Sequence, residues 1–373
     1  MKSYGLIGHY LSLSHFSNIV GLPSRLVELL PYNFVKRAIA TLPPYKFLEI
    51  PEIISKKGKS AKGAIFIVPM FPEHAIQMEE KMLQKIVQAC QRAESAGVDI
   101  VSLAGYTSVL GNEGEVVSRK VNLAVTSGNT LTAALAIRGL RIASQLMGID
   151  WKNATVAIVG ASGDIGSGCF RVISREVRKL ILVARREKLF GTLVNSVDKT
   201  ISAEIVIAKN VKDAISSADL ILSATSALTT VIDSSDLKPG AVVCDVALPH
   251  SVGIGVMRKR NDVLVFDGGM AKLPQPLFDK SEQWYKVSPD GETVFGCLAE
   301  AMLLALEERI ENYSIGRGNI TPDRIYEMES LASIHGFELA NFKYNGIAYS
   351  SEMIKRIRDQ AELNRQKMIC EMK

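Results

Sequence analysis

Residues 154–168, ATVAIVGASGDIGSG, decide the fold of this chain. The segment 154–160 is an unbroken run of small and apolar residues, which predicts a short strand buried on both faces. A turn with Gly160, Gly163 and Gly166 follows, and a helix begins after it. Such glycines let the backbone approach a pyrophosphate, and the helix N-terminus binds the negative charge. The segment therefore predicts the nucleotide-binding turn of a Rossmann-type domain, with a tight turn that holds no ligand as the alternative.

The second strand of this domain indicates which cofactor the turn holds. The glycine spacing is GxxGxxG rather than the GxGxxG of the usual NAD fingerprint, and this form recurs in NADP-linked folds. An NAD site carries Asp or Glu near the end of the second strand, whereas this chain has Arg185 and Arg186 there. Arginine suits the multidentate contact with a 2′-phosphate, and Ser162 adds a hydroxyl donor. We therefore expect NADPH, although Glu187, just past the expected position, keeps NAD open. The other residues expected against the cofactor are Asp164, Ile165, Ala224 and Thr225.

Further apolar segments continue the pattern of the first strand. Short strands are expected at 179–185, 204–208, 219–225, 241–247 and 263–269. Buried strands at near-regular intervals, joined by polar or helical connections, predict a doubly wound parallel sheet.

The rest of the chain divides where this pattern changes. Residues 1–128 alternate strands with helices, which predicts an N-terminal α/β substrate-binding domain, although the first sixty residues show no clear elements. Residues 129–289 form the NADP-binding Rossmann domain, with a linking helix at 129–147. Residues 290–373 are expected to form a helical C-terminal part. The predicted fold class is therefore α/β, with a Rossmann-type doubly wound parallel sheet.

The composition excludes several classes of protein. The chain has 373 residues, 47% of them hydrophobic and 22% charged, so it can bury a sizeable core and is not a disordered chain. A net charge of +5 is mild for this length and does not indicate nucleic-acid binding. The five scattered cysteines form no CxxC pair and no metal-binding cluster, so we expect a reducing, cytoplasmic environment and no metal site. No apolar run approaches the ~18 residues of a transmembrane helix, which leaves only peripheral membrane contact open.

A second stretch, GETVFGCLAEAMLLALEERI (291–310), places Cys297 where a helix is expected to begin. Apolar residues recur at helical spacing along one face, and Glu300 falls on the other side at the spacing of a capping box. A thiol here faces unpaired backbone N–H groups and the positive end of the helix dipole. We therefore expect the pKa of Cys297 to be lowered and the thiolate to be favoured. A small buried hydrophobic residue is the alternative interpretation.

A thiolate and a nicotinamide cofactor together indicate a recognised chemistry. The thiolate attacks a thioester or similar acyl donor and becomes acylated. Hydride from NADPH then reduces this acyl-enzyme, and an aldehyde is released. Helix N–H groups near Cys297 would stabilise the oxyanion. His9 and His250 are candidate acids for protonating the product, with structural roles as the alternative.

Several long, ordered motifs carry a resemblance to a known family. They are GLIGH (5–9), GVDIVSLAGYTSVLG (97–111), TSGNTLTAA (126–134), MGIDWKNATVAIVGASGDIGS (147–167), FGCLAEAMLL (295–304) and SIGRGNIT (314–321). In them the chain resembles the long-chain acyl-[acyl-carrier-protein] reductases of cyanobacteria. The resemblance spans most of residues 1–336, matches poorly over 20–60, and leaves the tail 338–373 outside the family pattern.

The resemblance has definite implications for function. It implies NADPH-dependent reduction of long-chain fatty acyl thioesters, carried by acyl carrier protein or coenzyme A, to fatty aldehydes, as part of lipid metabolism. It places the thioester intermediate on Cys297 and divides the chain into substrate, cofactor and helical parts. It also implies stimulation by Mg²⁺, for which the sequence shows no site, and an aldehyde-processing enzyme as a partner.

Further candidates lie in loops that follow strands, where α/β proteins place ligands. Thr107, Ser108, Asn129 and Thr130 are expected to line the acyl or nicotinamide site, with ordinary turn and helix-cap roles as the alternative. Two basic groups are candidates for docking an acidic carrier protein, with solvated faces as the alternative. They are Lys56, Lys57, Lys59 and Lys62, and Lys355, Arg356, Arg358, Arg365 and Lys367.

Two other functions remain open. One is a shikimate-type or amino-acid-type dehydrogenase that acts on a small polar substrate. It would need a catalytic Lys–Asp pair in the first domain, and it would give Cys297 no role. The other is a nucleotide-binding or lipid-binding module without catalysis.

Overall fold

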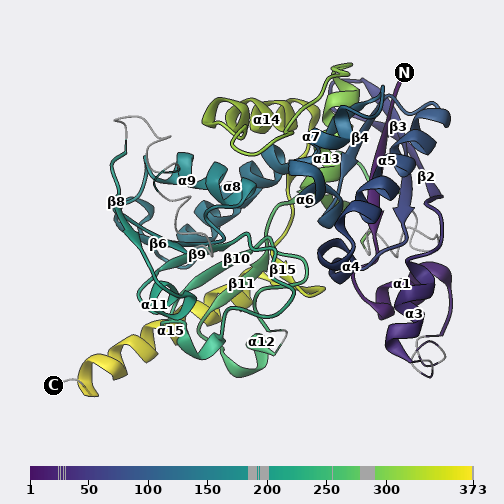
Figure 1. The fold of residues 1–373 in the computed structure, drawn as a ribbon. Helices are drawn as coiled ribbons and strands as arrows, with labels where there is room; N and C mark the ends of the chain where they lie inside the picture. The colour runs from purple at the N-terminus through teal and green to yellow at the C-terminus, as the bar shows by residue number, and fades with distance from the viewer. Residues whose placement is uncertain are drawn as a thin grey trace. The chain divides into compact units, whose positions relative to one another are not determined.

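The computed structural model describes residues 1–23, 25, 27, 29, 31–183, 191, 193, 201–253, 255–277 and 290–371. The chain forms two compact units (Figure 1). Unit 1 comprises Met1–Leu131, Ala271–Asn319 and Glu327–Glu338, and unit 2 comprises Thr132–Met270, Ile320–Tyr326 and Leu339–Lys373. The segment 290–373 is distributed over both units. The expected domain boundaries at 128 and 289 stay a prediction.

Unit 2 is built on a six-stranded sheet in the order β11-β10-β9-β6-β7-β8. Every neighbouring pair in it runs parallel. The chain starts in the middle, builds one edge and returns to build the other, which is the Rossmann order. The predicted fold class is confirmed. The strands are β6 (Thr155–Val159), β7 (Lys179–Val183), β8 (Glu204–Ile207), β9 (Leu220–Ser223), β10 (Val242–Asp245) and β11 (Leu264–Asp267).

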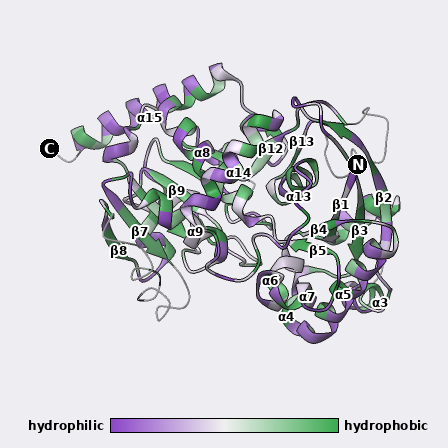
Figure 2. Ribbon diagram, turned by 90° about the horizontal axis from the view of Figure 1, so that it is seen from above, coloured by the Kyte–Doolittle hydropathy of each residue, from purple (hydrophilic) through white to green (hydrophobic). Residues whose placement is uncertain are grey.

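The apolar runs form strands here because helices cover both faces of the sheet. The strands β6, β9 and β10 are buried along their whole length. Helices α8 (Asn129–Leu146) and α9 (Asp164–Ile173) lie on one side of the sheet, and α11 (Val211–Ile215) lies on the other (Figure 1). In Figure 2 the labelled strand β9 is coloured mainly as apolar residues. Strands covered on both faces are continuous apolar runs rather than alternating ones, which is why the sequence located the buried strands.

Unit 1 contains a five-stranded sheet in the order β2-β3-β1-β4-β5. The strand β1 (Lys2–His9) is central and runs parallel to β3 (Ser60–Val68) and β4 (Ile100–Leu103). The strand β5 (Ala124–Thr126) runs parallel to β4, and β2 (Tyr45–Ile54) forms an antiparallel edge. The sequence predicts strands at 64–68, 99–104 and 121–125, which overlap β3, β4 and β5, but it shows no clear pattern for β1 or β2.

The two missed strands carry residues that weaken a strand pattern. In β1, Gly5 makes room for Val101, because a Cβ at Gly5 would lie 3.0 Å from the Val101 Cγ1 atom. In β2, Pro51 lies within an irregular pairing register, between Ile50 and Ile53. Glycine is tolerated in a strand where a neighbouring side chain packs closely, and proline is tolerated in an edge strand. Both conditions depend on the assembled sheet and are not visible in the sequence.

The helix α13 (Gly296–Leu306) packs against β1, β3 and β4. All of its residues except Cys297 are buried, and Glu300 is among the buried ones. The expectation of one apolar face and an exposed acidic side is therefore wrong for this helix. A helix that is apolar nearly all round belongs in a core.

The remaining elements are short or peripheral. They are α1 (Leu13–Val20), α3 (Tyr32–Ile39), α4 (Pro72–Gln77), α5 (Glu79–Ser95), α6 (Tyr106–Glu113), α7 (Glu115–Ser118), η1 (Trp151–Asn153), η2 (Ser234–Asp236), α12 (Val256–Lys259), β12 (Met270–Lys272), β13 (Thr293–Phe295), α14 (Pro322–His335), β14 (Glu338–Leu339), β15 (Lys343–Tyr344), β16 (Ile347–Ala348) and α15 (Ser351–Glu371). None of the helices in the described part of the chain combines the length and the apolar character that crossing a membrane requires.

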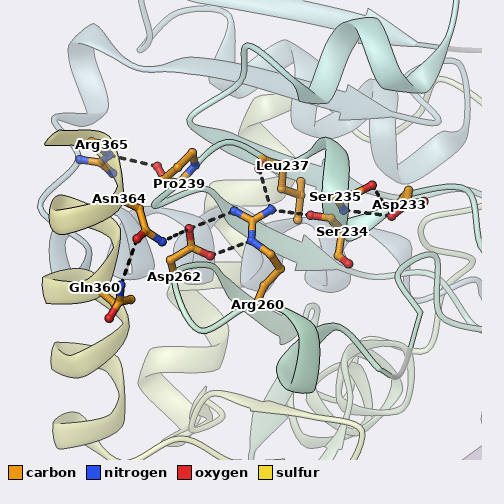
Figure 3. Close-up of polar contacts among 10 residues, drawn as sticks. All are labelled: Asp233, Ser234, Ser235, Leu237, Pro239, Arg260, Asp262, Gln360, Asn364 and Arg365. Carbon is orange, nitrogen blue, oxygen red and sulfur yellow. Dashed lines mark hydrogen bonds and ion pairs between the residues drawn. The ribbon is translucent and has the colours of Figure 1, made fainter. Parts of the chain in front are cut away.

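The tail helix α15 is attached to unit 2 through a buried carboxylate (Figure 3). Asp262 is 3% exposed and accepts hydrogen bonds from Arg260 Nε at 2.7 Å and Arg260 Nη2 at 3.1 Å. The same carboxylate accepts from Asn364 Nδ2 of α15 at 2.9 Å. Arg365, one of the predicted docking residues, instead donates to the backbone oxygen of Pro239 at 3.0 Å. The helix is therefore held by specific polar contacts as well as by its buried apolar residues.

Substitution of Asp262 tests this attachment. Asp262→Asn is expected to lower the free energy of unfolding by about 2–4 kcal/mol, because it leaves Arg260 without its charge partner. Asn364→Ala removes one hydrogen bond to the same carboxylate and should lower it by about 1–2 kcal/mol. Urea denaturation followed by circular dichroism measures both values. Equal midpoints for wild type and Asp262→Asn at neutral pH would contradict the role given to this carboxylate.

The effect of Asp262→Asn should also depend on pH. Burial alone raises the pKa of Asp262, but hydrogen bonds from Arg260 and Asn364 outweigh it and hold the pKa below its ordinary value. A carboxyl group whose pKa is depressed by folding stabilises the protein above its unfolded pKa of about 3.9 and loses this effect as pH falls through the folded value. The difference between the two proteins should therefore be constant near neutrality and shrink below about pH 4.

Candidate active site

The glycine turn after β6 lies against the end of β9. Gly160 has a φ of +88°, in the left-handed region that favours glycine. A Cβ at Gly160 would lie 2.5 Å from the backbone oxygen of Ala224 and 3.0 Å from the amide nitrogen of Thr225. A Cβ at Gly166 would overlap the backbone oxygen of Gly160. The structure thus brings together the expected turn and the expected residues after the fourth strand, and the close backbone approach requires glycine.

The helix α9 begins directly after this turn with no side-chain cap. Its N-cap residue is Gly163, which offers no oxygen to the first backbone N–H groups. Ser162, Gly163 and Ile165 are partly exposed, whereas Asp164 is buried and interacts electrostatically with Arg171 of the same helix. Uncapped N–H groups at the positive end of a helix favour a phosphate. These residues therefore fit the pyrophosphate of a dinucleotide.

The residues expected to select the cofactor cannot be placed. Arg185 and Arg186 lie outside the described residues, and so does Glu187. They follow β7, which pairs with β6 and ends at Val183. The preference for NADPH stays a prediction from the sequence.

Cys297 occupies the first turn of α13, where the sequence predicts it. The residue is partly exposed, but protein atoms surround its sulfur. Burial raises the pKa of the Cys297 thiol to about 12, the charge of Glu300 adds to the rise, and the backbone N–H of Leu298 opposes it. The expected lowering of this pKa is therefore wrong, because removal from water outweighs the helix N-terminus.

The loop TSGNT (126–130) packs directly on Cys297. A Cβ at Gly128 would overlap the Cα atom of Cys297 and would lie 2.5 Å from its Cβ atom. Gly128 has a φ of +70°, and its N–H donates to Thr126 Oγ1 at 3.1 Å. Only glycine lets the loop backbone come this close, so the loop forms one wall of the thiol site.

Glu300 ties this loop to the helix that carries Cys297. Its carboxylate is fully buried, accepts a hydrogen bond from the Thr126 hydroxyl, and accepts another from the Leu131 N–H at 2.8 Å. The spacing from Cys297 indicated a capping box, but the helix has no side-chain cap at Phe295 and Glu300 turns toward the loop instead. Both ends of the loop are therefore bonded to one carboxylate, which holds Gly128 against the cysteine.

Asn129 and Thr130, two of the predicted substrate residues, lie in the same loop. Thr130 Oγ1 is 2.5 Å from Ser314 Oγ, and Ser127 Oγ donates to the Ser314 backbone oxygen at 2.5 Å. Asn129 Nδ2 donates to Glu113 Oε2 at 3.4 Å, and Glu113 itself is buried with a left-handed φ of 53°. Sequence reasoning missed Glu113 and Ser314. The signal that marks Ser314 is its place in SIGRGNIT, one of the motifs that carry the family resemblance.

The hydroxyl groups of Thr107 and Ser108 form hydrogen bonds with backbone oxygens. Thr107 Oγ1 donates to two backbone oxygens, each at 2.9 Å. Ser108 Oγ donates to the backbone oxygen of Gly105 at 2.8 Å. Both side chains stabilise the first turn of α6, and a role at the substrate site stays a prediction.

The two histidines differ in their environments. His9 Nε2 accepts from the Tyr106 N–H at 3.0 Å, so Nδ1 carries the proton and donates to Tyr10 O at 2.9 Å. Burial lowers the pKa of His9 to about 4, which leaves it neutral and structural. His250 lies 3.7 Å from both Asp245 and Asp267. Burial opposes protonation of His250, but these carboxylates outweigh it and raise its pKa.

No group of three His, Cys, Asp or Glu side chains in the described ranges is arranged to hold a metal ion.

The family model for shikimate / quinate 5-dehydrogenase matches residues 141–267, which lie in unit 2. A long-chain acyl-[acyl-carrier-protein] reductase from Synechococcus elongatus is 30% identical over 348 residues, and the match covers 90% of this chain and 98% of that protein. The chain belongs to the long-chain acyl-[acyl-carrier-protein] reductase family.

Two other proteins resemble this chain over less of their length or at lower identity. The aminotransferase PigE from a Serratia species is 30% identical over 292 residues, which cover 78% of this chain but 34% of PigE, so the chain spans about a third of that relative. The crystal structure of shikimate 5-dehydrogenase from Listeria monocytogenes is 11% identical, with a TM-score of 0.35, and the match covers 72% of this chain and 86% of that one. Membership of the acyl-[acyl-carrier-protein] reductase family and the Rossmann-type sheet support an NAD(P)-dependent oxidoreductase.

Gly128→Ala tests the close approach that this family member makes at its cysteine. We expect the free energy of unfolding to fall by about 2–4 kcal/mol, of which about 1–2 comes from the left-handed backbone and the rest from overlap with Cys297. Gly58→Ala is the matched control, because Gly58 has a φ of +76° but no heavy atom within 4 Å of a Cβ. It should lose only about 1 kcal/mol. Equal losses for the two variants, measured by urea denaturation, would show that the loop does not press on Cys297.

Thiol alkylation tests the raised pKa of Cys297. At about pH 7.5 iodoacetamide should modify the exposed Cys370 well before Cys297, whose thiol burial keeps protonated. Because the thiolate fraction grows tenfold per pH unit below the pKa, the rate at Cys297 should rise about tenfold per unit between about pH 7 and pH 10. Peptide mass spectrometry at successive times measures both rates. A plateau above about pH 8 would mean an ordinary or lowered pKa.

Proposed function

We propose that this protein reduces long-chain fatty acyl thioesters to fatty aldehydes with NADPH, and that the acyl group is carried on Cys297. The observation that carries the proposal is the thiol at the start of α13 beneath the loop TSGNT. This arrangement joins a nucleophile, uncapped helix N–H groups and a closely packed wall in one place. The name of the Synechococcus elongatus relative supports the substrate class.

The chemistry is covalent catalysis in two stages. The Cys297 sulfur bonds to the acyl carbon, the bond from that carbon to the carrier sulfur breaks, and the carrier thiol leaves with the proton. N–H groups in the first turn of α13 would stabilise the oxyanion, and the loop TSGNT would keep water from the acyl-enzyme. The bound nicotinamide supplies the hydride. The carbon–sulfur bond to Cys297 then breaks, the aldehyde leaves, and the sulfur takes a proton from solvent, which regenerates the thiol.

The raised pKa of Cys297 is compatible with this role. The free thiol is almost wholly protonated near neutral pH, which protects it from oxidation between turnovers. A thiolate of high basicity is also intrinsically more nucleophilic once it forms. Over the whole acylation step the proton of Cys297 ends on the departing carrier sulfur, and the attacking species is the small fraction of Cys297 that is thiolate.

The cofactor and the partners belong to this proposal. NADPH is preferred because Arg185 and Arg186 follow the second strand in the sequence. Acyl carrier protein or coenzyme A would deliver the acyl group, and an aldehyde-processing enzyme would take the product. Mg²⁺ stimulation follows from the family resemblance alone, and no residue is assigned to it.

The first basic group is a weaker docking surface than its sequence indicates. Lys56 pairs with Glu338 at 3.2 Å. Lys57 and Lys59 pair with Glu307 at 3.3 Å and 3.6 Å. Because these positive charges are offset within unit 1, an acidic carrier protein would have to compete with the existing ion pairs.

A small-substrate dehydrogenase is the second candidate, which the match to residues 141–267 favours. That match covers the dinucleotide-binding part, which proteins of many functions share. The Lys–Asp pair that the structure shows in unit 1, Lys2 with Asp99 at 3.1 Å, lies at the amino ends of β1 and β4. Ligands of α/β proteins bind at the carboxyl ends of strands, so this pair is badly placed for catalysis.

Turnover assays separate the candidates. Wild type should oxidise NADPH and form aldehyde from a long-chain acyl thioester, and Cys297→Ala should lower the rate at least about 10³-fold. Cys370→Ala, which removes an exposed thiol, should leave the rate unchanged. Without NADPH, mass spectrometry should find an acyl adduct on the 291–310 peptide.

Three other results of these assays would contradict the proposed reaction or favour another function. Aldehyde formed by Cys297→Ala at the wild-type rate would reject the nucleophile. NADP⁺ reduction with small hydroxy acids would favour the dehydrogenase. Binding of NADPH and acyl chains without turnover would favour a module that only binds.

A further inference from the structure

A shallow surface depression of about 680 Å³ (the cavity), open to solvent, lies beside the amino ends of strands in the unit 2 sheet. Trp151 and Lys152, which line it, come just before β6, and Arg175 and Arg178 come just before β7. Because β6 and β7 are parallel neighbours, the cavity lies at their amino ends. The glycine turn follows the carboxyl end of β6, so the cavity is separate from the position expected for NADPH.

The residues that line the cavity carry more positive than negative charge. The carboxylate among them belongs to Glu176. It accepts hydrogen bonds from Arg141 Nε at 3.1 Å, Arg141 Nη2 at 2.5 Å and Trp151 Nε1 at 3.1 Å. Arg141 therefore neutralises Glu176. The other cations of the cavity, Lys152, Arg175 and Arg178, are exposed. Within the part of the chain that the structure describes, no carboxylate forms an ion pair with these three.

Arg175 and Arg178, together with Lys152, whose charge Asp150 partly offsets, attract a multiply charged anion. Arginine binds phosphate oxygens through two parallel N–H donors, which gives both strength and orientation. The half-exposed Trp151 adds an indole ring, and nucleotide bases stack on such rings.

We propose that this cavity is a second nucleotide site, in which Lys152, Arg175 and Arg178 hold the phosphates and Trp151 contacts the base. The ligand chemistry is a base joined to two or more phosphates. It has two sources, a free nucleotide and the nucleotide half of coenzyme A. The proposal does not rest on the reaction at Cys297, because binding is measured without turnover.

Trp151 itself provides the readout. The chain has two tryptophans, so Trp284→Phe leaves Trp151 as the only one. With the Rossmann site saturated by NADP⁺, titration with ATP should change Trp151 fluorescence with a Kd below about 1 mM at low salt. The Kd should rise with ionic strength, since exposed charges are screened. Calorimetry on the unmodified protein should give the same Kd and replaces the fluorescence assay if Trp284→Phe does not fold.

The ligands distinguish the two sources. Inorganic tripolyphosphate that competes with ATP shows that the phosphates supply most of the affinity. Coenzyme A that binds about tenfold or more tightly than ATP identifies the cofactor thiol as the source, whereas the reverse order identifies a free nucleotide.

Matched variants decide whether the cavity is the site. Arg175→Ala/Arg178→Ala should weaken ATP binding about tenfold or more. Lys81→Ala/Lys120→Ala removes the same charge from exposed positions in unit 1 and should leave the Kd unchanged. Thermal unfolding checks that both proteins are folded. Equal weakening by the two double variants, or no binding to wild type up to about 10 mM, overturns the proposal and makes the surface an ordinary solvated one.

Discussion

The buried carboxylate of Glu300 is the constraint on which the thiol site depends. An ionised group removed from water must find hydrogen-bond donors, and here they come from Thr126 and the Leu131 N–H. Because these donors stand at the two ends of one loop, satisfying the carboxylate also closes the loop over α13. Closure brings the backbone at residue 128 onto Cys297, and only glycine leaves room for it. One buried charge thus determines both the position of the loop and a residue type in it.

The same closure sets the chemistry of the sulfur. A helix N-terminus favours the thiolate, but packing the loop on Cys297 removes water and places the Glu300 charge nearby, and these effects prevail. The resting thiol is therefore protonated and poorly reactive toward general electrophiles. A thioester is attacked by the thiolate rather than by the thiol, so the proposed acylation would require Cys297 to lose its proton before or as the new bond forms.

The sequence predicted those parts of the structure that local pattern determines. The central strands β6, β9 and β10 of the unit 2 sheet are buried on both faces, so their apolar runs are visible without any knowledge of their neighbours. The helix α13 was located at its first residue, but its exposed side was misread, because the partners of Glu300 lie 169 and 174 residues away in the chain. The pKa of Cys297 was misjudged for the same reason. Desolvation depends on which distant segment packs on the thiol, and no spacing between neighbouring residues reports that.

The helix α8 links the two halves of the proposed chemistry along the chain itself. It begins at Asn129, within the loop on Cys297, and from Thr132 onward its residues belong to the nucleotide-binding unit. Its Leu131 N–H bonds to Glu300, so the carboxylate that fixes the surroundings of the thiol also holds the first turn of this helix. Substitution of Glu300 therefore removes the acceptor of a backbone N–H in the first turn of α8 as well as the carboxylate beside Cys297.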